Sequence, residues 1–136
     1  MKLTHATVWV HDQDEALAFY TEKVGFEVRE DVTMTEMGDF RWLSVGYPGQ
    51  SDVLLVLMKL MGPHEFDQDT ADKLADLVAK GVVSPVFFET DDLQGLYETL
   101  KARGVEFQQE PTQMPYGIDC AFRDPSGNQI RVAQRN

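Results

Sequence analysis

The sequence of 136 residues predicts an α+β fold built from two tandem β-α-β-β-β modules, whose curved mixed sheet surrounds a cavity. Two observations support this prediction. The order of the patterns, one strand, one helix and three further strands, occurs once in each half of the chain. Matching landmarks, such as Gly25 and Gly104, lie about 80 residues apart. Because neither half could bury its sheet alone, we expect a single domain, 1–136, with modules at about 1–61 and 83–136.

The first module begins with residues 4–10, in which apolar side chains alternate with other side chains, as in a half-buried strand. Asp12 or Asp14 would cap the following helix, and Gly25 would end it. Turn residues separate the three remaining strands of this module. These strands are expected at about 26–32, 40–46 and 52–60.

A connecting helix is expected within residues 62–82, with Asp69 or Thr70 as its cap, Gly81 at its end and His64 in a loop before it. The second module then repeats the order of the first. Its helix would be capped by Asp91 or Asp92 and ended by Gly104. The strands are expected at 85–90, at 105–109 as a short strand, and at 117–123 and 128–134 as a hairpin around the turn DPSG.

The composition restricts the possible partners and compartments. With 12 basic and 23 acidic residues the formal charge is −11, which repels phosphate backbones and attracts cations, so nucleic acid is not an expected partner. The aliphatic run 53–58 is too short to cross a bilayer, and the N-terminus lacks the layout of a signal peptide. Cys120 is the single cysteine and cannot form an intramolecular disulfide. We therefore expect a cytoplasmic protein without membrane contact.

The two ends of the chain carry a family resemblance. The opening HATVWVHDQDEALAFYTEKVGFEV and the closing FRDPSGNQIRVAQ, together with the paired module layout, resemble the vicinal oxygen chelate superfamily. This superfamily includes glyoxalases, bleomycin-resistance-type binding proteins and extradiol dioxygenases. The resemblance spans essentially the whole chain, and it implies a cavity formed by two half-cups and a homodimer. Unpaired strand edges give a physical reason for such an association.

The resemblance also implies where a metal would be held. Metal-dependent members place a histidine on the first strand, a His or Gln on the first strand of the other module, and a Glu in the last strand. His5 matches the first position, but Ser84 or Pro85 occupies the second and Arg131 the third. A guanidinium offers only donors, stays protonated and repels a nearby cation. We therefore expect no metal or other cofactor at this site.

Strand alternation predicts the side chains that line the cavity. If residue 123 pairs with residue 129, Arg131 lies diagonal to Asp119, and we hypothesise an ion pair on the cavity floor; the alternative is that both are solvated surface residues. Cys120 would face the core as a small apolar residue. The remaining candidates are His5, Thr7, Trp9, Phe87, Glu89, Tyr116 at the rim, and either Phe40 and Trp42 or Arg41 and Leu43.

Three functional hypotheses follow. The first is a bleomycin-resistance-type protein, hence an antibiotic-resistance function, that sequesters a hydrophobic or aromatic ligand, cationic ligands included, in a metal-free cavity. The second is an enzyme, a glyoxalase-like lyase or dioxygenase with His5 as a catalytic residue. It would hold Zn, Ni, Mn or Fe with His5 and unconventional ligands such as Asp119, Glu89 or a residue of a partner subunit. A weaker version is a metal-free isomerase or hydrolase with His5 as general base and Asp119 or Glu89 as the orienting group. The third is a collapsed cavity and a role in protein contacts.

Overall fold

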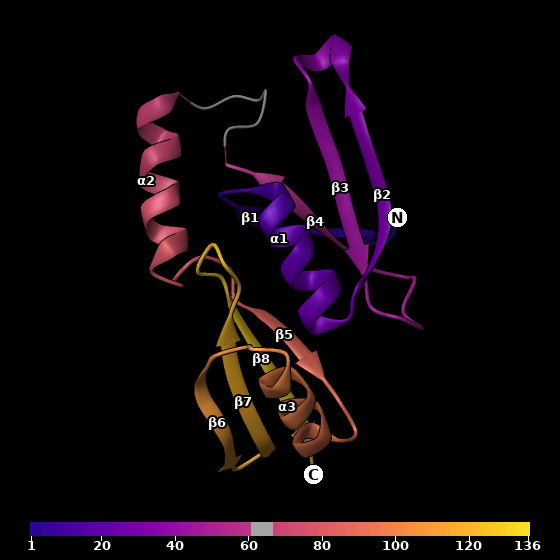
Figure 1. The fold of residues 1–136 in the computed structure, drawn as a ribbon, viewed down its shortest axis with the longest axis vertical. Coiled ribbons are helices and arrows are strands. Elements are labelled where there is room, and N and C mark those ends of the chain that lie inside the picture. Colours follow the sequence, from indigo (N-terminus) through magenta and orange to yellow (C-terminus); the bar gives the residue numbers. More distant parts are fainter. Residues whose placement is uncertain (61–66) are drawn as a thin grey trace.

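The computed structural model describes residues 1–60 and 67–136 (Figure 1). Each module contributes one four-stranded sheet, and α2 (Gln68–Ala79) stands between them in the chain. Module one consists of β1 (His5–Val10), α1 (Gln13–Ala18), a π-helical turn (Phe19–Val24), β2 (Glu27–Met34), a 3-10 turn (Thr35–Met37), β3 (Phe40–Gly46) and β4 (Leu54–Lys59). Module two consists of β5 (Val86–Glu89), α3 (Leu93–Ala102), β6 (Phe107–Met114), β7 (Gly117–Arg123) and β8 (Gln129–Arg135).

The two sheets have the same topology. Their strand orders are β1-β4-β3-β2 and β5-β8-β7-β6. In each sheet the first strand of the module pairs in parallel with the last, and the other pairs are antiparallel. The predicted α+β fold of two β-α-β-β-β modules is confirmed.

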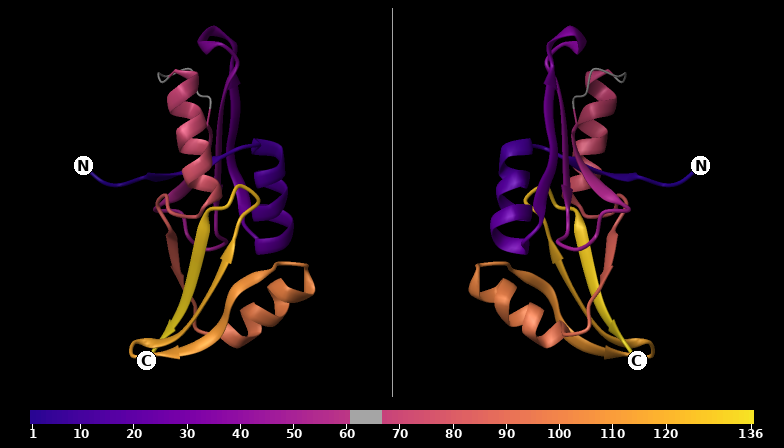
Figure 2. Two further views of the ribbon diagram at one scale, coloured as in Figure 1. Left: turned by 90° about the vertical axis from the view of Figure 1, so that its left-hand side faces the viewer. Right: turned by 90° about the vertical axis from the view of Figure 1, so that its right-hand side faces the viewer.

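One face of each sheet is covered by a helix. Figure 2 shows α1 and α3 on the same side of the two sheets. A single hydrophobic core runs beneath these helices and takes residues from both modules, among them Val8, Leu43, Phe122 and Val132. The opposite side of the sheets carries polar and aromatic side chains of both modules. We call it the polar face, and it includes His5, Glu30, Trp42 and Ser44 from module one and Phe87, Gln109, Asp119 and Arg131 from module two.

Aspartates cap the three α-helices. Asp12 accepts a hydrogen bond from the Glu15 amide at the start of α1, and Asp92 accepts one at the start of α3. The cap of α2 is Asp67, whose carboxylate accepts from the Thr70 amide at 2.8 Å, so the prediction of Asp69 or Thr70 is wrong. His64 lies outside the described residues. No helix in the described ranges is long and apolar enough to cross a membrane.

The first helix changes its winding before it ends. The predicted uniform helix is replaced by α1 and the π-helical turn, in which the amides of Gly25 and Phe26 both donate to the Tyr20 carbonyl. Gly25 ends the turn as predicted, with a φ of 97° in the left-handed region. The wider winding occurs where the large side chain of Tyr20 is fully buried.

A β-bulge occurs at equivalent places in β2 and β6. In β2, Val28 lies opposite Val45, but after one extra residue Glu30 lies opposite Ser44. In β6, Phe107 lies opposite Phe122, and Gln109 then lies opposite Ala121. Because the extra residue reverses the alternation, each bulge turns the next side chain from the core to the polar face.

The strand β6 is also longer than predicted. The short strand expected at 105–109 begins at Phe107 and continues to Met114, past a second irregularity that contains Pro111. Proline cannot donate to a neighbouring strand, and β6 is an edge strand, which tolerates it.

The turn between β7 and β8 joins the two modules. The buried Asp124 accepts hydrogen bonds from the amides of Ser126 and Asn128 within the turn and, at 2.8 Å, from the Tyr20 hydroxyl of module one. The Asn128 amide group donates to the Trp9 carbonyl at 2.7 Å. Burial, together with the Asp124 carboxylate, raises the pKa of Tyr20. The DPSGN motif therefore fixes the position of the second hairpin against the first module.

Candidate functional site

A buried carboxylate organises the polar face of module two. Asp119, which is only 3% exposed, accepts hydrogen bonds at Oδ2 from the Arg131 Nε and the Tyr116 hydroxyl, at 3.3 and 2.9 Å. Its Oδ1 accepts from the Arg131 Nη2 and, at 3.0 Å, from the Gln109 amide. The strand register is as predicted, with Arg123 opposite Gln129 and Ala121 opposite Arg131. The hypothesised ion pair is present, and the alternative of two solvated residues is wrong.

These contacts hold the guanidinium of Arg131 in position and favour its protonated form. Its Nη2 also donates to the Gln109 side-chain oxygen at 3.1 Å, so Gln109 bridges the two members of the ion pair. The hydrogen bond with Asp119 raises the pKa of Arg131. The pKa of Tyr116 is also raised, because its hydroxyl donates to the same carboxylate. The guanidinium therefore stays cationic and in one place.

The ion pair forms the floor of a cavity of about 470 Å³. This volume lies within the range that is common for small-molecule sites. Phe87, with 69% of its surface exposed, lines this space and also the hollows next to it. Glu89 also lines the cavity and forms an exposed ion pair with Arg135 at 3.0 Å. The structure thus brings five of the predicted residues around one space: Phe87, Glu89, Tyr116, Asp119 and Arg131.

A second polar cluster occupies the polar face of module one. Glu30 Oε1 lies 2.7 Å from His5 Nε2 and accepts from the Ser44 hydroxyl at 2.9 Å, while Oε2 accepts from the Trp42 indole at 2.8 Å. The rings of His5 and Trp42 meet edge to face with centroids 5.3 Å apart. The hydrogen bonds from His5, Trp42 and Ser44 lower the pKa of Glu30. His5 and Trp42 were predicted, whereas Glu30 and Ser44 were not.

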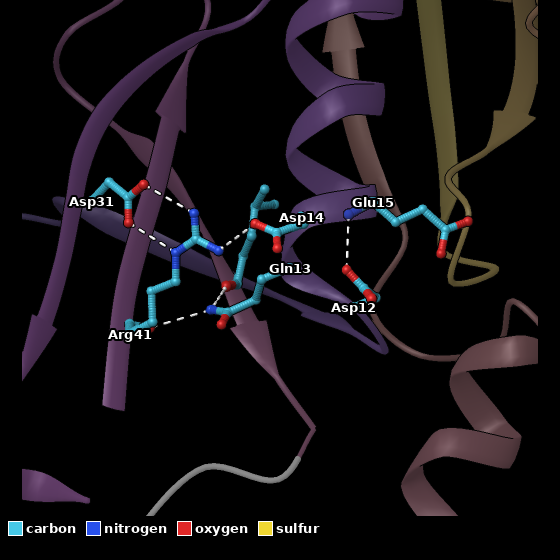
Figure 3. A network of polar contacts seen from close by, with 7 residues as sticks. Asp12, Gln13, Asp14, Glu15, Asp31 and Arg41 are labelled. Carbon is cyan, nitrogen blue, oxygen red and sulfur yellow. Dashed lines mark hydrogen bonds and ion pairs between the residues drawn. The ribbon is translucent and has the colours of Figure 1, made fainter. Parts of the chain in front are cut away.

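The alternatives for β3 are resolved. Leu43 is fully buried in the core, and Trp42 lies on the polar face, so the alternative that placed Arg41 and Leu43 in the cavity is wrong. Figure 3 shows where Arg41 points instead: its guanidinium binds Asp31 on β2 at 2.8 Å and Asp14 on α1 at 2.7 Å. Gln13 of the same helix donates to the carbonyl of Arg41 (Figure 3). It also donates to the carbonyl of Leu57, and the two hydrogen bonds secure α1 to the sheet.

The remaining predicted residues do not line the cavity. Thr7 is exposed, Trp9 is half-buried, and Phe40 is buried at the start of β3. Cys120 lies in the core as predicted, and burial raises the pKa of its thiol to about 11. Such a thiol is not a nucleophile near neutral pH.

A further hollow of about 330 Å³ lies at the junction of the modules, and it shares Phe87, Phe88 and Glu89 of β5 with the cavity. Its walls are mainly core side chains such as Phe26, Leu96, Phe122 and Val132. It has no buried ion pair comparable with that of Asp119. We therefore place the candidate site in the cavity on the polar face.

The side chains at the inherited metal positions do not fit a divalent cation. His5 uses its Nε2 for Glu30, Pro85 has no side-chain donor atom, and Arg131 is a cation. In residues 1–60 and 67–136, no three or more His, Cys, Asp or Glu side chains are grouped so that they could hold a metal ion.

Two four-stranded mixed sheets, each with one face covered by a helix and one polar face, define a two-module α+β fold. Residues 2–132 match the model of the Glyoxalase/Bleomycin resistance protein/Dioxygenase superfamily, and the chain belongs to this superfamily. It is 36% identical over 135 residues to the uncharacterized protein YurT of Bacillus subtilis (strain 168), which covers 99% of this chain and 100% of that relative.

Two solved structures resemble this one over nearly the whole chain. UcmS2 shares 45% sequence identity and a TM-score of 0.89, with 98% of this chain and 97% of that chain covered. TnmS3, an antibiotic binding protein from Streptomyces sp. CB03234, shares 29% identity and a TM-score of 0.76, with 100% and 97% covered.

Proposed function

We propose that this protein is a small-molecule-binding protein of the bleomycin-resistance type, which sequesters a hydrophobic or aromatic ligand. The observation that carries the proposal is the cavity of about 470 Å³, which is lined by the exposed Phe87 and by the ion pair of Asp119 with Arg131. An exposed aromatic ring beside oriented polar groups suits a flat organic molecule. The likeness to TnmS3, an antibiotic binding protein, supports an antibiotic as the ligand.

Binding in this proposal requires no metal. The donor set at the inherited metal positions supports this part, since His5 is engaged by Glu30 and Arg131 is engaged by Asp119. A lyase or dioxygenase would need His5 to give up this hydrogen bond and two further ligands to approach it.

The proposal includes a homodimer in which the cavities are shared. Phe87 is largely exposed in the single chain, and β1 and β5 each leave one edge of their sheets unpaired. A second copy that covers this surface would bury the ring and complete the cavity wall. Sedimentation equilibrium should give twice the mass of one chain; a monomer at every concentration would contradict the shared cavity.

The binding proposal is tested by titration calorimetry with 2-acetylnaphthalene, a planar aromatic probe, in the presence of EDTA. We expect saturable binding that weakens about tenfold in Phe87→Ala, because the ring loses its stacking partner. The control is Val82→Ala, which removes another exposed apolar side chain, one that does not line the cavity. Absence of saturable binding, or equal affinity in Phe87→Ala, would contradict the proposal.

A further inference from the structure

The hydrogen bonds of Asp119 use the full capacity of its carboxylate. An ionised carboxylate offers about four lone-pair positions. Asp119 accepts from Arg131 at both oxygens, from Gln109 at one and from Tyr116 at the other. No position remains for a donor group of a ligand, and a cationic ligand cannot pair with this carboxylate without displacing a partner.

The hydrogen bonds of Arg131 use only some of its N–H groups. A guanidinium carries five N–H groups. The Nε and Nη2 of Arg131 donate to Asp119 and Gln109, whereas no hydrogen bond between described residues uses its Nη1. Arg131 lines the cavity with 22% of its side chain exposed. Its two Nη1 donors are thus available on a group that its neighbours hold in place.

The charges that line the cavity balance. Arg131 is paired with Asp119, and Arg135 is paired with Glu89 in the exposed ion pair. The Tyr116 hydroxyl, which donates to Asp119, has no charge. The cavity therefore offers strong donors without a net positive charge, while the whole chain, at −11, repels anions.

We infer that this cavity selects a planar aromatic ligand that carries a neutral carbonyl oxygen, which accepts a hydrogen bond from Arg131 Nη1 while the ring lies against Phe87. The inference rests on the proposed function and deepens it, because it names the ligand class and the residue that sets the preference. Arg131 donates a hydrogen bond to the carbonyl of the ligand, and Asp119 and Gln109 position Arg131. An aromatic hydrocarbon offers no acceptor to Arg131, and the guanidinium repels an aromatic cation.

The test compares ligands of one shape. The probes are 2-acetylnaphthalene, its isostere 2-isopropenylnaphthalene, in which a CH₂ group replaces the carbonyl oxygen, and the cation 2-naphthylmethylammonium. In the wild-type protein, titration calorimetry should show about tenfold tighter binding of the ketone than of either comparison probe, as expected for one hydrogen bond from a charged donor.

The test variant removes the Arg131 donor and does not leave the Asp119 carboxylate buried without a cation. Arg131→Met alone would leave the buried Asp119 carboxylate without a cation, so we pair it with Asp119→Asn, whose amide can donate to the Gln109 oxygen that Arg131 releases. The matched control is Arg41→Gln, which breaks another arginine pair, with Asp31 and Asp14, away from the cavity. Thermal unfolding of each variant verifies that it is folded.

The outcomes separate the two proposals. Loss of the tenfold preference in the double variant, with the preference kept in Arg41→Gln, supports the inference. Equal affinity for ketone and isostere in the wild-type protein, tighter binding of the cation, or an unchanged preference in the double variant would overturn the inference while leaving the binding function intact. Failure of all three probes to bind would overturn the proposed function and the inference with it.

Discussion

The two modules place a carboxylate on the same face of the same scaffold, but different partners hold it. Glu30 of module one comes from β2, has 38% of its side chain exposed, and is held by His5, Trp42 and Ser44. Asp119 of module two comes from β7, has 4% of its side chain exposed, and is held mainly by Arg131. In module one the donors of His5, Trp42 and Ser44 are all used on Glu30, whereas in module two no hydrogen bond between described residues uses Arg131 Nη1.

The comparison shows what the duplicated scaffold fixes and what it leaves free. Glu30 and Gln109 occupy equivalent positions, because each follows the bulge of an edge strand and lies opposite an equivalent residue of the next strand. The backbone device is therefore the same in both modules. The side chain at this position is a carboxylate in module one and an amide in module two, where the carboxylate comes from β7 and pairs with Arg131 of β8.

The largest expected effect on stability follows from breaking the ion pair between Arg131 and Asp119. Arg131→Ala should lower the free energy of unfolding by about 3 kcal/mol, because Asp119 remains buried without a cation. The matched change in module one, His5→Ala, should cost about 1 kcal/mol or less, because Glu30 keeps Trp42 and Ser44 and is reached by water. Urea unfolding measures both, and equal losses would show that the two clusters are energetically alike.

The next prediction compares two turns, the one between β7 and β8 in module two and the one between β3 and β4 in module one. Gly127 has a φ of 104°, and a Cβ there would lie 2.7 Å from the Ala79 backbone, so Gly127→Ala should cost about 3 kcal/mol. Gly49 of module one has a φ of 87° but nothing within 4 Å, so Gly49→Ala should cost only about 1 kcal/mol. Urea unfolding of the two variants measures the difference. If Gly127→Ala proved no costlier than Gly49→Ala, the close packing of the second turn against α2 would be refuted.

The smallest expected effect is the pH dependence of the stability that Glu30 of module one contributes. Because the pKa of Glu30 is lowered from 4.5 in the folded protein, its contribution is complete above about pH 4.5 and is lost as the pH falls through the lowered value. For a side chain this exposed we expect at most about 1 kcal/mol. Glu30→Gln should therefore lose less stability than the wild-type protein between about pH 6 and pH 3. Identical losses, measured by urea unfolding, would show that Glu30 carries none of this dependence.

Alternation along regular strands predicted part of the site, and the bulges concealed the rest. The DPSGN turn fixes the β7–β8 register, so the contact of Asp119 with Arg131 followed from counting residues. Glu30 is two residues after Val28, and Gln109 is two residues after Phe107. In a regular strand, residues two apart lie on the same face of the sheet, so alternation places each pair on one face. The extra residue in each bulge reverses that assignment. A single sequence carries no clear signal for such a residue.

The helix boundaries show the same limit. Gly25 and Gly104 were predicted as helix ends because the left-handed conformation favours glycine, and both have positive φ values. The cap of α2 was placed too late because Asp67, Asp69 and Thr70 are all good capping residues. Local propensity alone does not choose between them.

The most direct test of the central claim, a ligand site on module two that works without a metal, is the affinity of 2-acetylnaphthalene measured with and without divalent cations. Protein treated with EDTA and protein reconstituted in turn with Zn, Ni, Mn and Fe(II) would be titrated by calorimetry. We predict the same Kd in every case, and the same Kd in His5→Ala. Binding that appears only after one metal is restored, and that disappears in His5→Ala, would contradict the account and identify His5 as a metal ligand.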